Sequence, residues 1–161
     1  MPRCIGISVS SLWSASPRRS VLSPEDHRRL SQDDIRSRLA VDLAEHFIVG
    51  AFDDGKLVGT AGFVRQPGVK ERHKGRIWGV YLKAERRGKG IGLSMMKLLL
   101  NRAADIEGLE QILLSVTTTQ AAAIALYRSL SFTSFGYEVR ALKIGDRFID
   151  EEYMVLRLPT H

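Results

Sequence analysis

The chain has 161 residues, 44% of them hydrophobic and 26% charged, with a formal net charge of +6 at pH 7. This length and apolar content fit one compact domain with a hydrophobic core, and they exclude a wholly disordered chain. The single cysteine, Cys4, excludes an intramolecular disulfide framework, and the four scattered histidines lack the spacing of a metal site, so no metal is expected.

The amino-terminal part carries few structural signals. No apolar run reaches the ~18 residues of a membrane span, and the start of the chain lacks the continuous apolar region of a secretory signal. The default expectation is a cytoplasmic location without membrane contact. We predict an irregular segment over residues 1–24, with 4–9 as a candidate short strand, and a single domain over residues 25–161. Capping residues and apolar residues four apart then predict a helix over about residues 32–43.

Three apolar runs in the first half of the domain indicate strands. The runs 47–52 and 56–64 flank Asp54-Gly55, which is a hairpin signal because such a tight turn needs positive φ. Residues 66–75 are polar and basic, contain proline and glycine, and predict an exposed loop. The run 77–82 predicts a third strand, in which Gly79 indicates a bulge or a close backbone approach.

The second half of the chain alternates helices and strands. Apolar periodicity predicts two amphipathic helices, over residues 93–104 and 120–130, and three strands, over residues 111–118, 134–142 and 152–158. The last two strands are joined by a turn at Gly145-Asp146. The predicted fold class is therefore α+β, with a mixed, mainly antiparallel central sheet and flanking helices.

A glycine-rich segment, Arg86-Arg87-Gly88-Lys89-Gly90-Ile91-Gly92, lies between a predicted strand and a predicted helix. The first N–H groups of a helix have no intrahelical partner and carry partial positive charge, and glycines let the backbone approach a phosphate closely. The spacing excludes a Walker loop, because Lys89 is followed by Gly90 instead of Ser or Thr. It also excludes the G-x-G-x-x-G dinucleotide fingerprint, because Leu93 stands where the third glycine would be.

Two motifs of the sequence resemble those of the GNAT superfamily of N-acetyltransferases. The pattern Arg-x-x-Gly-x-Gly, formed by Arg87, Gly90 and Gly92, is similar to the acyl-CoA pyrophosphate loop of the family. Residues 123–132 are similar to its second motif, written A-x-x-L-Y-x-x-x-G-F. The order of predicted elements also matches, so the resemblance covers roughly residues 25–158, and the carboxyl-terminal part is similar to uncharacterised bacterial members.

The resemblance implies that acetyl-CoA is the cosubstrate and that its pantetheine arm enters a gap between two splayed strands, here 77–82 and 111–118. Gln120 stands where many members have an asparagine that binds this arm, so the amide is moved by one methylene. Ser131 replaces the glycine that usually follows the second-motif helix. The implied acetyl-CoA contacts are Val80, Tyr81, Leu82, Arg87, Gly88, Lys89, Gly90, Ile91, Gly92, Leu93, Gln120 and Tyr127.

The implied reaction is direct attack of a primary amine on the thioester. The amine must be neutral, and because a lysine-like amine has a pKa of about 10.4, a base or a water relay has to take its proton. A backbone N–H of residues 80–82 is a candidate donor to the oxyanion. Tyr127 occupies the tyrosine position of the family and is the candidate catalytic acid for the leaving thiolate. Tyr81 is a weaker candidate for that role.

No residue stands out as the base. Glu71, in the loop before the third strand, and Glu151, near the last strand, are the candidates, although each pattern is also typical of a plain surface carboxylate. Glu85, just before the glycine loop, is expected to be solvent-exposed. His73 lies in a basic loop and is a candidate for lining the mouth of the acceptor pocket.

Three functions stay open on the sequence alone. The first is an acetyl-CoA-dependent N-acetyltransferase with an unidentified amine acceptor. The second is a CoA-binding regulatory or degenerate domain without turnover, because the amino terminus is irregular and the base is not evident. The third, a basic nucleic-acid-binding module, is disfavoured because Lys and Arg are spread along the chain. Exposed last strands often pair in the superfamily, which leaves a homodimer open.

Overall fold

The computed structural model describes residues 6–10 and 44–159. The predicted helix over residues 32–43 lies outside the described residues, and so does most of the segment 1–24, whose boundary with the domain stays a prediction. Gly6–Ser10, the described part of that segment, forms strand β1 and overlaps the candidate strand 4–9.

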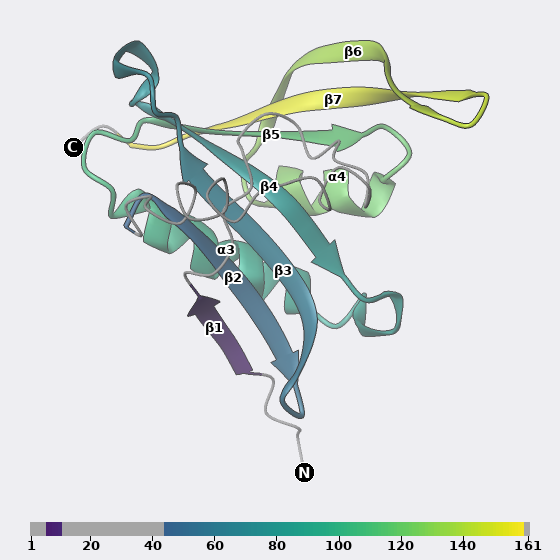
Figure 1. The fold of residues 1–161 in the computed structure, drawn as a ribbon, viewed down its shortest axis with the longest axis horizontal. Coiled ribbons are helices and arrows are strands. Elements are labelled where there is room, and N and C mark those ends of the chain that lie inside the picture. Colours follow the sequence, from purple (N-terminus) through teal and green to yellow (C-terminus); the bar gives the residue numbers. More distant parts are fainter. Residues whose placement is uncertain (1–5, 11–43, 160–161) are drawn as a thin grey trace, which may run out of the picture.

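One seven-stranded sheet organises the described residues, with the strand order β1-β2-β3-β4-β5-β7-β6 (Figure 1). Every neighbouring pair is antiparallel except β4 and β5, which run parallel. The predicted α+β class with a mixed, mainly antiparallel sheet is therefore confirmed. The strands after β1 are β2 (His46–Asp53), β3 (Lys56–Arg65), β4 (Lys74–Leu82), β5 (Gln111–Thr117), β6 (Thr133–Ile144) and β7 (Arg147–Arg157).

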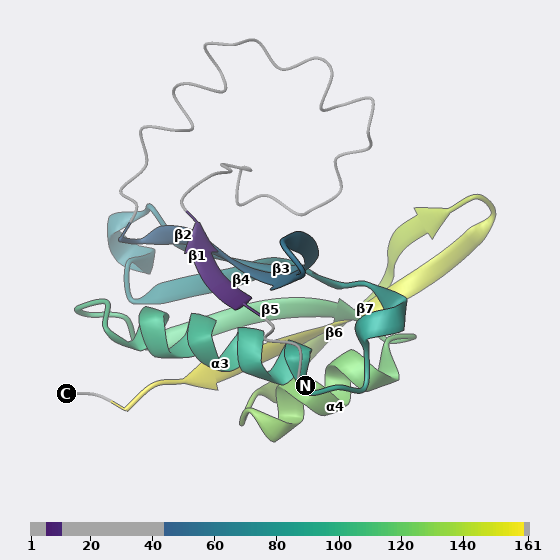
Figure 2. The same cartoon turned by 90° about the horizontal axis from the view of Figure 1, so that it is seen from below.

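Two helices, α3 (Ile91–Ala104) and α4 (Ala121–Ser129), cover the same face of this sheet (Figure 2). Met95 and Leu99 of α3 are fully buried in one core cluster with Phe63 of β3. Burial of such a side chain contributes about 1.5–3 kcal/mol of stability. The core therefore fixes α3 on the sheet, and with it the position of the glycine-rich segment that precedes this helix.

The hairpin between β2 and β3 is closed by the predicted Asp-Gly turn. Asp54 has φ 48° and Gly55 has φ 75°, and positive φ at both central residues is the mark of a type I′ turn, whose twist matches that of paired strands. This prediction is confirmed. The turn also fixes the end of β2, where Asp53 lies buried.

Three elements begin two or more residues earlier than predicted. Strand β4 begins at Lys74, inside the predicted loop 66–75, of which the remainder contains the exposed 3-10 turn η1 (Val69–Glu71). Strand β7 begins at Arg147 instead of residue 152, and α3 begins at Ile91 instead of residue 93. The added strand residues are mostly polar, with Gly75, Phe148 and Ile149 as the exceptions, and they pair with neighbouring strands through their backbone groups. A ladder satisfies backbone groups whatever the polarity of the side chains, so the apolar pattern underestimates strand length.

The carboxyl-terminal end of α4 is a Schellman motif. The N–H of Phe132 donates to the carbonyl of Tyr127 at 3.1 Å, and the N–H of Ser131 donates to the carbonyl of Arg128 at 3.0 Å. The rings of Tyr127 and Phe132 meet edge to face, 6.0 Å apart, which is the apolar contact that accompanies this motif. The motif places Ser131 at φ 68°, a left-handed conformation that favours glycine.

We therefore expect Ser131→Gly to stabilise the protein by about 1 kcal/mol, because relief of the left-handed strain exceeds the added entropy of the unfolded chain. For a chain of this length that gain corresponds to a rise in Tm of roughly 2–4 °C in thermal unfolding. Ser134→Gly, at an exposed position of β6, is the matched control and should not raise Tm. An unchanged or lower Tm for Ser131→Gly would contradict the assignment of strain.

Candidate functional site

The sheet opens between its two parallel strands. Strands β4 and β5 pair only at Lys74–Gln111, Gly75–Ile112 and Arg76–Leu113, and their remaining residues are not paired with each other. The facing edges beyond this point carry backbone N–H and C=O groups without a strand partner. Such an opening can receive an extended chain that contains amide groups, which is what the resemblance to the GNAT superfamily implies for this pair of strands.

A bulge in β4 shapes the rim of this opening. Gly62 pairs with Trp78 and Thr60 pairs with Tyr81, so Gly79 and Val80 together oppose a single residue of β3. Gly79 has φ 58°, and the Thr60 hydroxyl donates a hydrogen bond to its carbonyl at 3.1 Å. The predicted bulge is thus confirmed. It leaves Val80 37% and Tyr81 55% exposed, so the end of β4 is accessible to a ligand.

The glycine-rich segment follows at the same end of β4. A 3-10 turn, η2 (Ala84–Arg86), leads from the strand to Gly88 and Gly90, which have φ 72° and 76°. Gly90 is the N-cap of α3, no side chain caps this end, and the first turn contains no acidic residue. An ideal Cβ at Gly88 or Gly90 meets no atom within 4 Å. The open space in front of both residues faces unpaired helix N–H groups, which is the chemistry of an anion site.

The cationic side chains of this segment differ in the groups that they contact. The Arg87 Nε donates to the carbonyl of Leu82 at 3.0 Å, so Arg87 is held close to the end of β4. Lys89 is exposed. Arg86 instead forms an ion pair with the buried Asp53. Of the three, Arg87 and Lys89 are therefore the positive side chains that no carboxylate engages in an ion pair.

Two predicted site residues, Tyr127 and Gln120, lie in helix α4 and at its N-cap. Tyr127 is 5% exposed, and burial raises the pKa of its phenol to about 12. The phenol is therefore protonated at neutral pH. Gln120 is the exposed N-cap residue of α4, and its side-chain amide does not cap the helix. The first turn of α3 lies beside α4, since an ideal Cβ at Gly92 would be 3.6 Å from Leu126.

The candidate bases are separated by the structure. Glu71 and His73 precede Lys74, whereas the accessible residues of β4 begin at Gly79. A strand rises about 3.3 Å per residue, so the Lys74 end of β4, next to which Glu71 and His73 lie in the chain, is roughly 20 Å from Val80. Neither is therefore brought to the opening. Glu85 is exposed in η2, as expected. Glu151 pairs with Thr117 at the open end of β5 and is the candidate base that the fold keeps near the site.

Sequence reasoning missed a second carboxylate beside Glu151. Glu138 of β6 is the register partner of Glu151, and the Tyr153 hydroxyl donates a short hydrogen bond to the Glu138 carboxylate. A β-bulge between Glu138 and Leu142 sets this register. Because the two carboxylates come from strands paired through an irregular ladder, no local signal of the sequence could have brought them together.

The sheet face opposite α3 carries Trp78 and His46. An ideal Cβ at Gly62 would lie 2.5 Å from the Trp78 ring, so the ring lies directly over Gly62 in β3. The His46 and Trp78 rings meet edge to face at 6.1 Å, and burial lowers the pKa of His46. His46 is therefore neutral at pH 7. Its place at the start of β2, beside the closed end of the β4–β5 opening, removes it from the accessible end of β4.

A model of the Acetyltransferase (GNAT) family matches residues 8–132. The chain belongs to this family. The matched range contains the β4–β5 opening, the glycine-rich segment and α4.

Three similar proteins illustrate the range of the GNAT family. An L-methionine sulfoximine/L-methionine sulfone acetyltransferase of Pseudomonas aeruginosa is 33% identical over 82 residues, 50% of this chain and 47% of that protein. A spermine/spermidine N(1)-acetyltransferase of Bacillus subtilis is 33% identical over 87 residues, 52% of this chain and 57% of that protein. The chain thus spans about half the length of these curated relatives.

The third is a crystal structure of a GNAT superfamily phosphinothricin acetyltransferase of Sinorhizobium meliloti in complex with acetyl-CoA. It superposes with a TM-score of 0.64 at 27% identity, over 70% of this chain and 61% of that chain.

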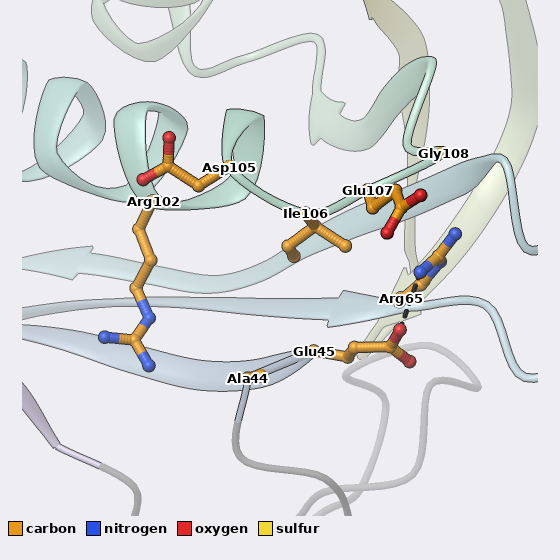
Figure 3. Close-up of a pocket in the computed structure, with 8 residues that line it drawn as sticks. All are labelled: Ala44, Glu45, Arg65, Arg102, Asp105, Ile106, Glu107 and Gly108. Atoms are coloured by element: carbon orange, nitrogen blue, oxygen red, sulfur yellow. Dashed lines mark hydrogen bonds and ion pairs between the residues drawn. The ribbon is translucent and has the colours of Figure 1, made fainter.

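The GNAT domain also has a pocket at the end of the sheet that lies away from the glycine-rich segment (Figure 3). Two of its charged lining residues, Arg65 and Glu45, form an ion pair at 2.6 Å, and Arg72 pairs with the same carboxylate. This pocket adjoins the carboxyl-terminal end of α3, whereas the glycine-rich segment precedes the amino-terminal end. It is not part of the opening between β4 and β5. The lining residues are Ala44, Glu45, Arg65, Arg102, Asp105, Ile106, Glu107 and Gly108.

Two further observations concern the described residues alone. Within residues 6–10 and 44–159, no helix is both long enough and apolar enough to cross a membrane. In the same ranges, no three or more His, Cys, Asp or Glu side chains are grouped so that they could hold a metal ion.

Proposed function

We propose that this chain binds acetyl-CoA in the β4–β5 opening and transfers the acetyl group to a primary amine. The observation that carries the proposal is the uncapped amino-terminal end of α3, preceded by two glycines with positive φ, at the mouth of the opening. The residues that would hold acetyl-CoA follow from this arrangement. They are Val80, Tyr81 and Leu82 along the arm, Arg87, Gly88, Lys89, Gly90, Ile91, Gly92 and Leu93 at the pyrophosphate, and Gln120 and Tyr127 from the α4 side.

The residues present fit this ligand in three respects. The glycines leave free the space that a Cβ would fill, the helix N–H groups and two cations face an anion, and the β4 edge offers unpaired amide partners. Acetyl-CoA supplies an activated acetyl thioester. A backbone N–H of residues 80–82 stabilises the negative charge that develops on the acetyl oxygen. The Tyr127 phenol, protonated below a pKa of about 12, donates a proton to the departing thiolate.

The acceptor is proposed to be a primary amine of a small molecule. The relatives named above act on methionine sulfoximine or sulfone, on spermine or spermidine, and on phosphinothricin, and each of these molecules carries a primary amine. Glu151, beside the open end of β5, is the proposed base that takes the amine proton, directly or through water. A cytoplasmic location and a homodimer remain predictions of the sequence.

A thiol-release assay tests this function. The full chain is incubated with acetyl-CoA and a panel of polyamines, amino acids, amino-acid analogues and amine-bearing peptides, and free CoA is measured over time. We expect acceptor-dependent release of CoA for at least one class of amine. Tight binding of acetyl-CoA by calorimetry without turnover on any acceptor would instead favour the CoA-binding domain that lacks catalysis.

A further inference from the structure

The acetyl transfer proposed above assigns no role to an ion pair at the start of the glycine-rich segment. The Arg86 guanidinium, in η2, contacts the carboxylate of Asp53, the last residue of β2. Asp53 is 5% exposed, whereas the Arg86 side chain is 31% exposed. A carboxylate buried to this degree is costly unless it is paired, so Asp53 strongly favours the position of Arg86 that is seen.

The pair connects two elements that the chain order separates. Asp53 belongs to the rigid β2–β3 hairpin, which is closed by the type I′ turn, and Arg86 belongs to the turn that leads into Gly88 and Gly90. A second link runs parallel to it: the N–H of Lys83 donates to the carbonyl of Val58 in β3 at 2.9 Å. The start of the glycine-rich segment is thus tied to the hairpin at two points.

We infer that the Asp53–Arg86 ion pair is a positioning element for pyrophosphate binding, which fixes the glycine-rich segment in the geometry that presents the α3 N–H groups. This inference rests on the proposed acetyl-CoA site. It also divides the cations of the segment by task. The ion pair with Asp53 neutralises the charge of Arg86 and holds the segment in place. Arg87 and Lys89 then bind the phosphates.

Stability and affinity should separate when the pair is altered. Arg86→Gln leaves the Asp53 carboxylate buried without its partner, so we expect Tm to fall and CoA binding to weaken. Adding Asp53→Asn removes the lone charge, so Tm should recover in the double variant. The CoA Kd should stay about tenfold above wild type in both, because groups that orient ligand-binding residues commonly control affinity to this extent. Arg86→Lys retains an ion pair and should bring both quantities close to wild type.

Glu45→Gln is the matched control, because Glu45 forms an arginine ion pair near the opposite end of β2. Its CoA affinity should equal that of wild type even where its Tm is lower. Calorimetric titration of CoA and thermal unfolding of the five proteins, wild type included, decide the matter. Recovery of CoA affinity together with Tm in Asp53→Asn/Arg86→Gln would show a merely structural pair and overturn the inference. Failure of wild type to bind CoA would overturn the proposed acetyl-CoA site itself.

Discussion

Gly90→Val is expected to abolish the binding of acetyl-CoA. Gly90 has φ 76° and caps α3, so a valine there places a branched side chain in the space in front of the unpaired helix N–H groups. It also strains the backbone, because β-branched residues rarely adopt positive φ. Blocking this approach removes the hydrogen bonds to the pyrophosphate, and calorimetry should show a loss of affinity of about a hundredfold or more, since several charge-assisted bonds are lost together.

A matched variant separates this effect from general destabilisation. Gly145, in the β6–β7 turn, has φ 60° and likewise has no atom within 4 Å of an ideal Cβ. Gly145→Val therefore imposes similar backbone strain far from α3. We expect both variants to lower Tm and only Gly90→Val to lose acetyl-CoA. Wild-type affinity in Gly90→Val would remove the glycine-rich segment from the site.

Tyr127→Phe is expected to lower kcat by about a hundredfold, the lower range for loss of a general acid, with little change in the Kd of acetyl-CoA. The phenyl ring retains the contact with Phe132 and the burial in the core, so the fold should persist. The pKa of Tyr127, raised to about 12 by burial, adds a pH criterion. About one pH unit below its pKa the phenol is still mostly protonated. The wild-type rate should therefore show no decline due to Tyr127 below about pH 11.

Two further tyrosine variants give this measurement its controls. Tyr137 is 61% exposed on β6 and Tyr81 is 55% exposed at the end of β4. Tyr137→Phe should have wild-type kcat, which establishes that removal of a surface hydroxyl is neutral. Tyr81→Phe tests the weaker candidate acid. If Tyr127→Phe turned over like wild type while Tyr81→Phe did not, the proton donor would have to be reassigned to Tyr81.

Local chemistry made much of the fold predictable. The Asp54-Gly55 turn and the bulge at Gly79 each depend on φ values that few residues adopt, so their glycines indicated them correctly. The strand boundaries were less accurate, because residues such as Lys74 and Arg147 pair through the backbone and give no apolar signal.

The parts of the site that sequence could not supply depend on contacts between distant segments. Glu71 and His73 adjoin β4 in the sequence, yet they lie at the end of the strand opposite to its accessible residues. Glu138 reaches Glu151 only through a bulged register, and Asp53 reaches Arg86 only because a hairpin folds against η2. Each of these contacts depends on the tertiary structure, and the sequence around either partner contains no pattern that predicts it.

The short contact between β4 and β5 has a mechanical consequence. Three register pairs at one end join two groups of strands. The first group is β1, β2, β3 and β4, and the second is β5, β7 and β6. The backbone hydrogen bonding of the sheet between these two groups is therefore confined to one end, whereas the strands within each group pair over most of their length. A ligand whose amides hydrogen-bond to the free edges of β4 and β5, and whose phosphates bind at the amino-terminal end of α3, would hold the two groups of strands together. If CoA binds in this way, its addition should slow amide hydrogen exchange along residues 77–82 and 114–117.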